Sequence, residues 1–426
     1  MHDRRAAPEE DALPAKSHGA WRETFQSFQH RDFRLLWIGS FGSAGGIWLM
    51  QVSLGWLAYE MTQSALQVGL ILGVRAAPLL LAPLTGVIAD RIDRRRLLLA
   101  DQAFLVVLVM TFAVVLLLER QQVWHLYVFA ELFGMGWAVS NPVRQMLTAT
   151  TVPREDLTNA IALMSIAFNS MRAIGPAIGG IFIAFFGPGV NFLLMGILFL
   201  AVFLLVVPFR ARYGTTDRTI VRAQSVMRNL VEGFRYVRHE PTTLTAISVT
   251  TAMTLTSMAL VFNQLPVYAA EVLLDDEGVL LGLLMMSLGI GGLVGTSFMA
   301  RFSRIRHKGI VGTIGFVCTS LAVLTLSQVS VLWAAMLTLA VQQAFVQLVM
   351  TSNQTIVQSI TPDDMRGRVT GVYQMEIGMM PIGGVIAGAI SAAYGVQTAF
   401  AFGAVTGLMV ITLFAVFVPR YRRLEL

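Results

Sequence analysis

Long apolar stretches separated by short polar segments repeat along most of the chain. Many contain close to 20 residues, the length that a helix needs to cross about 30 Å of hydrocarbon. The pattern therefore predicts an all-α membrane protein with twelve transmembrane helices. The expected spans are residues 33–59, 65–89, 97–118, 123–146, 158–186, 190–207, 242–270, 278–300, 309–327, 331–352, 368–394 and 397–418.

One long connection divides these spans into two six-helix halves. Apolar residues within it alternate with arginines, which indicates either a basic amphipathic helix on the membrane surface or a solvated linker helix. The predicted organisation is a cytoplasmic N-terminal tail (1–32), an N-terminal bundle (33–207), a cytoplasmic linker (208–241), a C-terminal bundle (242–418) and a cytoplasmic tail (419–426).

Positive charge is confined to alternate connections. All but three of the 31 Lys and Arg residues fall in segments that lie on one side of the predicted bundle, the exceptions being Arg75, Arg120 and Arg172. Cytoplasmic loops carry an excess of Lys and Arg, so this side is cytoplasmic and both termini lie inside. We therefore expect a multi-pass protein of the bacterial inner membrane.

The composition agrees with a membrane protein and excludes several other classes. Hydrophobic residues make up 55% of the chain and charged residues 13%, whereas about 25% of a soluble domain is charged. The net charge of +6 follows the topology, so we expect no nucleic-acid partner. The single cysteine, Cys318, excludes a disulfide framework. We find no nucleotide-binding loop, metal-ligand cluster or paired nucleophile and base, and predict no cofactor and no enzyme activity.

The two halves repeat each other. A shift of 209 positions superimposes glycines from the second span through the fifth, and a single offset over that length indicates a duplicated six-helix unit. The superimposed pairs include Gly69 with Gly278, Gly73 with Gly282, Gly175 with Gly384, and Gly179 with Gly388.

A polar loop lies between the second and third spans and reads Gly-Val-Ile-Ala-Asp-Arg-Ile-Asp-Arg-Arg-Arg over residues 86–96. It resembles the signature loop of the major facilitator superfamily, Gly-x-x-x-Asp-Arg-x-Gly-Arg-Arg, except that Asp93 replaces the last glycine. The resemblance implies that Gly86 and Asp90 help to latch the halves together on the cytoplasmic side. The resemblance makes this segment a gating loop. Its arginines, among them Arg91, Arg94 and Arg95, either take part in gating or act only as topogenic charges.

The fifth span carries Gly175-Pro176-Ala-Ile-Gly179-Gly180. This element resembles the antiporter signature of the same superfamily, which occurs mainly in exporters. The alternative is ordinary packing of small residues between membrane helices. The segments 141–144, 152–157 and 361–368 resemble the branch that contains enterobactin-type siderophore exporters and macrolide-efflux-type pumps, where such segments imply capping and gating.

Four ionisable residues lie well away from the ends of predicted spans, namely Arg75, Glu131, Arg172 and Glu376. Each costs about 2.5–3.5 kcal/mol at the centre of a membrane on insertion scales, so each needs a structural or functional reason. They either neutralise one another or serve a substrate and a proton. We single out Glu131 and Glu376 as candidates for proton coupling.

Further polar and aromatic residues are candidates for lining a central cavity. They lie in the first, seventh and tenth spans, which enclose the cavity in the fold that the resemblance implies. Together with the two arginines, the candidates are Trp48, Gln51, Arg75, Arg172, Asn263, Gln264, Gln343 and Gln347.

These observations predict a secondary active transporter with alternating access. We expect it to export a small amphipathic molecule, such as a drug, a siderophore or another metabolite, in exchange for protons. The expected partners are that substrate, protons and the lipid bilayer, and the expected state is a monomer. The alternatives are an importer or uniporter on the same fold, or a membrane receptor, scaffold or enzyme without transport activity.

Overall fold

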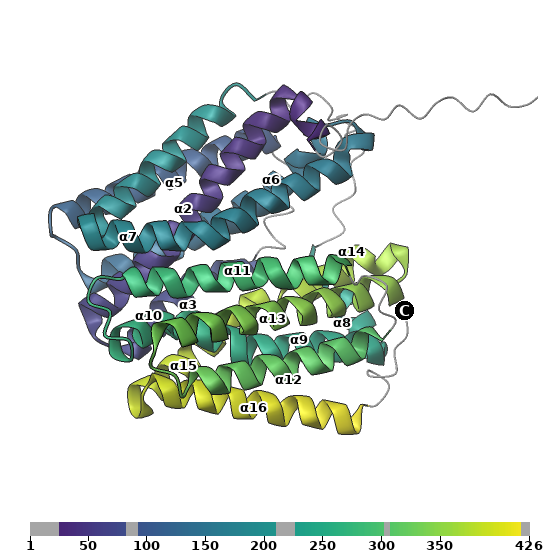
Figure 1. The fold of residues 1–426 in the computed structure, drawn as a ribbon. Helices are drawn as coiled ribbons and strands as arrows, with labels where there is room; N and C mark the ends of the chain where they lie inside the picture. The colour runs from purple at the N-terminus through teal and green to yellow at the C-terminus, as the bar shows by residue number, and fades with distance from the viewer. Residues whose placement is uncertain (1–24, 82–92, 210–225, 302–306, 419–426) are drawn as a thin grey trace, which may run out of the picture.

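The structure is a computed structural model that describes residues 25–81, 93–209, 226–301 and 307–418 (Figure 1). All regular elements within these ranges are helical, which confirms the predicted all-α class. In Figure 1, the upper block contains α2 (Arg31–Thr62), α5 (Arg94–Leu117), α6 (Val123–Thr151) and α7 (Leu157–Val206). Helix α3 (Ala65–Ala76) also comes from the first half, but it lies against the lower block.

The lower block is built from the second half of the chain. It is joined to the first half through α8 (Val226–His239), which follows the linker residues outside the described ranges. The helices of this block are α9 (Pro241–Met253), η4 (Thr254–Met258), α10 (Ala259–Glu271), α11 (Val279–Arg301), α12 (Lys308–Leu326), α13 (Leu332–Ile360), α14 (Asp363–Gln374), η5 (Ile377–Met379), α15 (Met380–Tyr394) and α16 (Val396–Phe417).

The helices account for twelve spans in two six-helix halves. Eight helical segments within the described residues are long and apolar enough to cross a membrane. One of them contains two spans, because Gly187 in α7 has a φ of 76° and turns the chain back between the fifth and sixth. The other three spans are α6, the second span, whose described part is α3 and the turn that follows it, and the eleventh span, which is interrupted.

The interruption of the eleventh span differs from the predicted continuous helix over 368–394. The span begins at Asp363, ends its first part at Gln374 and resumes at Met380 after a single 3-10 turn. Pro381 in the first turn of α15 has no backbone N–H, so it suits a helix start but not a helix interior. The second span changes in the same way, from α3 to the 3-10 helix η2 (Ala77–Leu81).

Short polar connections carry the helix caps. Asp93 precedes α5, and its Oδ1 accepts a hydrogen bond of 2.9 Å from the Arg96 backbone N–H. The residue that departs from the signature loop therefore caps the third span. Asp275 is buried before α11 and accepts from the backbone N–H groups of Gly278 and Leu281, each at 2.9 Å. Both carboxylates satisfy helix-start donors that would otherwise lack partners.

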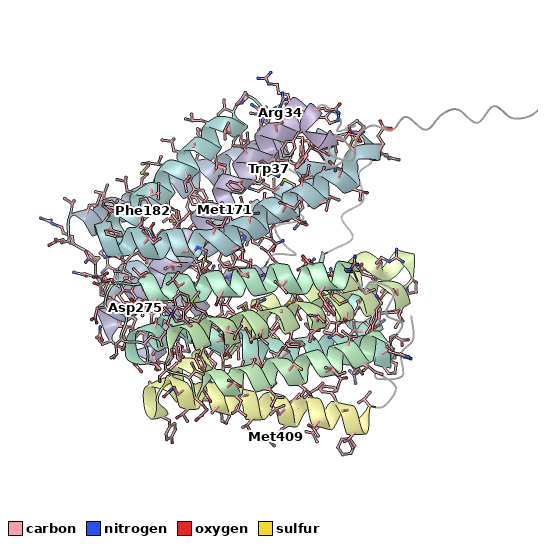
Figure 2. All side chains as sticks on the ribbon, in the orientation of Figure 1. Arg34, Trp37, Met171, Phe182, Asp275 and Met409 are labelled. Atoms are coloured by element: carbon pink, nitrogen blue, oxygen red, sulfur yellow. The ribbon has the colours of Figure 1, made fainter. Side chains whose placement is uncertain are left out.

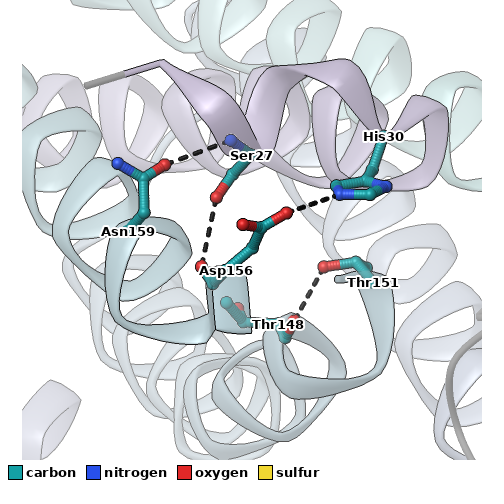
Figure 3. A network of polar contacts seen from close by, with 6 residues as sticks. All are labelled: Ser27, His30, Thr148, Thr151, Asp156 and Asn159. Atoms are coloured by element: carbon teal, nitrogen blue, oxygen red, sulfur yellow. Dashed lines mark hydrogen bonds and ion pairs between the residues drawn. The ribbon is translucent and has the colours of Figure 1, made fainter. Parts of the chain in front are cut away.

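The start of the described chain is held to the start of α7 (Figure 3). His30 Nε2 lies 2.8 Å from Asp156 Oδ2, and the Ser27 hydroxyl donates to the Asp156 carbonyl oxygen at 3.2 Å. The Ser27 backbone N–H donates to Asn159 Oδ1 at 3.1 Å. These bonds fasten the 3-10 helix η1 (Gln26–Gln29) and the beginning of α2 to the fifth span.

Apolar side chains fill the interior and also cover the outside. One buried cluster joins both halves, with Leu54 and Phe129 from the first half and Leu265 and Leu284 from the second. The outward faces are apolar as well, as Met409 on α16 illustrates (Figure 2). An apolar exterior on helices of this length is expected for a surface that contacts lipid.

Candidate functional site

The two halves meet where α7 crosses α11. A Cβ added at Gly180 would lie 2.8 Å from the Gly278 carbonyl oxygen and 3.0 Å from the Gly282 Cα. A Cβ added at Gly282 would lie 2.7 Å from the Pro176 carbonyl oxygen. The backbones approach so closely that only hydrogen fits between them, as at small-residue crossings in membrane proteins.

A second crossing joins α3 to α15 and uses the repeat-related positions. Gly69 packs against the Gly384 carbonyl, and a Cβ added at Gly388 would lie 2.8 Å from the Ala65 carbonyl oxygen. The repeat places Gly69 on Gly278 and pairs α3 with α11 and the fifth span with the eleventh. The duplicated glycines therefore form two of the close contacts between the halves.

The element Gly175 to Gly180 contacts both of its neighbours. A Cβ added at Gly175 would lie 2.8 Å from the Trp48 Cβ, and one added at Gly179 would lie 3.4 Å from a methyl carbon of Leu49. The element thus packs α7 against α2 on one side, while Pro176 and Gly180 pack it against α11 on the other. Because it joins the halves, it lies where a relative movement of the halves would act.

Arg172 and Trp48 lie together beside this element. The guanidinium carbon of Arg172 is 5.8 Å from the centre of the Trp48 ring, a distance typical of a cation–π contact. The same guanidinium faces Gly292 of the second half, where a Cβ would lie 3.7 Å from it and 3.7 Å from the Gln343 side chain. Trp48 also meets Phe262 of α10 edge-on at 6.3 Å. The structure therefore brings together three predicted cavity residues from three spans.

The remaining polar candidates have different surroundings. Gln264 donates from Nε2 to the Ala65 carbonyl oxygen at 3.3 Å, and so joins the halves. Asn263 is bonded within its own helix, to the Ala259 carbonyl oxygen at 2.8 Å. Gln347 lies 3.4 Å from Thr296 Oγ1. Buried side-chain nitrogens without a hydrogen-bond partner occur on Gln51, Gln343 and Trp48.

Among the described residues, the four predicted membrane charges form no ion pair with one another. Arg75 is buried and stacks over Trp137 of α6 at 5.5 Å. Glu376 is buried at the break in the eleventh span, and its Oε2 has no hydrogen-bond partner. Glu131 is half-buried on α6.

The predicted gating loop is described only in part. Gly86, Asp90 and Arg91 lie outside the described residues. Arg94 and Arg95 form the first turn of α5, and the Arg95 guanidinium donates to the Val207 carbonyl oxygen at the end of α7. At least one loop arginine therefore fastens the third span to the sixth.

A cavity of about 610 Å³ lies in the first half, between α2, α6 and the beginning of α7. Its wall combines aromatic and polar side chains, and Arg144 is the one charged residue among the described residues that line it. Cavities of this size suit small organic molecules. The principal lining residues are Ser40, Ser43, Phe133, Trp137, Ser140, Arg144, Met164, Phe168 and Phe199.

Arg144, the last residue of the segment 141–144, forms with its neighbours a polar cluster that was not predicted from the sequence. Arg144 donates from Nη2 to Ser43 Oγ at 2.7 Å and from Nη1 to Ser40 Oγ at 3.3 Å. Behind it, the Gln102 amide donates to Asp101 Oδ2 at 3.1 Å and to Ser140 Oγ at 3.2 Å. Both charged residues fall inside predicted spans, within a few positions of the ends. The only signal in the sequence was a charged residue inside a predicted span. Because both residues lie close to span ends, the sequence favoured a position at the membrane surface over a buried one.

The cavity and the crossings occupy different ends of the bundle. The cavity lies near the start of α2, the end of α6 and the start of α7, where the described chain also begins and ends (Figure 1). Asp275 caps α11 at the opposite end (Figure 2). Close to it in the chain, Glu271 Oε1 accepts a hydrogen bond of 3.0 Å from the Tyr59 hydroxyl of the first half.

Two six-helix halves that meet at glycine crossings beside a cavity define a membrane transporter with a major facilitator fold. The chain belongs to this superfamily and, within it, to the transmembrane secretion effector family, whose profile it matches over residues 22–425. The family comprises transporters rather than enzymes.

Curated relatives cover almost the whole chain. It is 26% identical over 395 residues to the multidrug efflux pump Tap of Mycolicibacterium fortuitum, which covers 90% of this chain and 94% of that protein. It is 24% identical over 392 residues to the staphyloferrin A transporter of Staphylococcus aureus, with 89% and 94% covered. It is 24% identical over 355 residues to the enterobactin exporter EntS of Salmonella typhimurium, with 82% of each chain covered.

Solved structures share the fold at lower identity. The nucleoside transporter NupG aligns with a TM-score of 0.73 and 12% identity, covering 91% of this chain and all of that one. A POT family transporter aligns with a TM-score of 0.74 and 12% identity, covering 93% and 99%. These likenesses confirm the fold predicted from the sequence.

Proposed function

We propose that this protein exports a small amphipathic molecule across the bacterial inner membrane by proton antiport. The observation that carries the proposal is the asymmetry of the bundle, with a mixed aromatic and polar cavity near one end and close glycine crossings toward the other. Relatives named as efflux pumps and exporters support the direction of transport. The substrate class is a drug-like compound, a siderophore or another secondary metabolite.

In this proposal the two bundles, residues 33–207 and 242–418, move against each other around the crossings. The distribution of Lys and Arg makes the end with the chain termini cytoplasmic. The structure then corresponds to a state whose cavity faces the cytoplasm, from which an exporter loads its substrate. Separation at Tyr59 and Glu271 would open the outer side, and the loop with Gly86 and Asp90 would close the inner one. The working unit is a monomer.

Glu376 is the stronger of the two proton-coupling candidates. Its carboxyl group is buried at a helix break in the eleventh span, and Oε2 has no hydrogen-bond partner among the described residues. Interrupted membrane helices commonly form the sites for substrates and coupling ions. Glu131 is only half-buried and lies in an unbroken helix. Glu131→Gln therefore serves as a matched comparison.

The test is transport into inside-out vesicles that carry an imposed pH gradient, acid inside. A panel of ethidium, 2-naphthoate and a catechol siderophore provides a cation, an anion and a larger metabolite. We expect uptake of at least one compound, accompanied by proton release, and loss of the gradient dependence in Glu376→Gln but not in Glu131→Gln. Movement in the opposite direction would indicate an importer. Transport that ignores the gradient in the unmodified protein would contradict antiport.

A further inference from the structure

The cavity in the first half holds one charged side chain that points to a ligand. Arg144 is 8% exposed and is surrounded by the first, third and fourth spans. An unpaired charge within a membrane helix is costly, so its presence beside a cavity suggests a role beyond topology. None of the other described residues that line the cavity is charged.

The contacts of Arg144 leave most of its hydrogen-bonding capacity unused. A guanidinium has five N–H donors, and two of them donate to the hydroxyls of Ser40 and Ser43. Both partners are neutral, and Arg144 forms no salt bridge with a carboxylate of the described residues. The hydroxyls therefore hold the guanidinium in place without neutralising it.

Asp101 influences this charge without touching it. It interacts electrostatically with Arg144, but its carboxylate is bonded to Gln102 and lies behind Ser140 of the cavity wall. Because it forms no hydrogen bond with the guanidinium, it reduces the cost of burying the arginine without occupying the N–H groups that a second anion would need. It would also repel that anion, which keeps the affinity moderate and permits release.

We propose that Arg144 is the anion-binding group of a substrate subsite, and that the preferred ligand is an apolar or aromatic molecule with a single carboxylate-like group. Arg144 would donate to the carboxylate, because a guanidinium matches its two oxygens in a bidentate geometry. The rings of Phe133, Trp137 and Phe168 would enclose the apolar part. This inference rests on the proposed transport function, since it names the substrate class for the same cavity.

The experiment measures equilibrium binding to the purified full-length protein in detergent. The probes are 2-naphthoate, its neutral analogue 2-naphthamide and the cation 2-naphthylmethylammonium. We expect the naphthoate to bind most tightly. Arg144→Gln should weaken naphthoate binding about 10- to 100-fold, the loss expected for hydrogen bonds to a charged group, while naphthamide binding changes little.

Asp101→Asn provides the opposite change. Removal of the repelling charge should tighten naphthoate binding several-fold and leave naphthamide unaffected. Arg144→Lys keeps the charge but not the planar fork, so it should fall between the unmodified protein and Arg144→Gln. If Arg144→Gln does not fold, the probe comparison on the unmodified protein and the Asp101→Asn result still decide the question.

Three results would overturn the inference. These are equal binding of naphthoate and naphthamide, preference for the cation, or a loss in Arg144→Gln that affects naphthoate and naphthamide alike. The test is separable from that of transport. Arg144-dependent binding without any movement across vesicles would refute only the transport function. Export of other panel compounds without naphthoate binding would refute only the anion subsite.

Discussion

Glu232 of α8 and Arg368 of α14 form an ion pair across 2.7 Å, which joins the linker helix to the eleventh span. Arg228 also donates to Glu232, at 2.8 Å, from the preceding turn of α8. Gly233 permits this approach, since a Cβ there would lie 2.9 Å from the Arg368 carbonyl oxygen. The linker helix is thus attached to the span that contains Glu376.

The first prediction concerns the pH dependence of this attachment. The hydrogen bond from Arg228, followed by the charges of Arg368, Arg228 and Arg235, holds the pKa of Glu232 below its ordinary value. The stabilisation is therefore present above the ordinary carboxyl pKa and is lost as the pH falls through the lowered one. Amide exchange in residues 226–239 should accelerate in that acidic range. Glu232→Gln should remove this dependence, whereas Arg238→Gln should preserve it.

The second prediction tests the crossing of α7 and α11. Gly180→Ala would place a methyl group against the backbone of Gly278 and Gly282. The helices must separate, so we expect a loss of about 1–3 kcal/mol in thermal stability and a large fall in transport. Gly371→Ala is the control, because a Cβ at Gly371 meets nothing within 4 Å. Equal behaviour of the two variants would show that the crossing is not tight.

The third prediction concerns Arg172 and Trp48. A double-mutant cycle with Arg172→Gln and Trp48→Leu should give a coupling of about 0.5–2 kcal/mol, the range of a cation–π contact. Thermal unfolding in detergent measures the stabilities of the unmodified protein, the two single variants and the double variant. Additive effects would indicate that the two side chains are only neighbours.

The fourth prediction concerns the attachment of the chain start to α7. Asp156→Ala removes the acceptor for His30 at a buried site, and we expect a loss of about 1–3 kcal/mol. Glu155→Ala is the matched control, because Glu155 is adjacent and exposed. Thermal unfolding of both variants measures the difference. If Asp156→Ala is as stable as Glu155→Ala, the network in Figure 3 does not stabilise the fold.

The fifth prediction returns to the signature loop, whose central residues lie outside the described ranges. If Asp90 latches the halves when the cavity faces outward, Asp90→Asn should reduce transport more than membrane insertion. Flux is measured in vesicles at matched protein levels. Unchanged flux would show that the loop does not act as a latch and that its charges serve only to set the membrane topology.

The membrane class, the twelve spans, the duplication and the superfamily could all be predicted from the amino-acid sequence. These properties depend on the length and order of apolar stretches and on a local motif, which are readable one segment at a time. The repeated glycines were also evident, although their role as paired contacts was not.

Which charges interact with each other and which of them line a cavity became evident from the packing of the helices. Arg144 and Asp101 lie near the ends of separate predicted spans, yet the packing of α2, α5 and α6 buries both of them close enough to interact electrostatically. The break beside Glu376 was likewise hidden within an apolar stretch. Helix rotation and crossing set these relationships, and they depend on contacts between segments far apart in the chain.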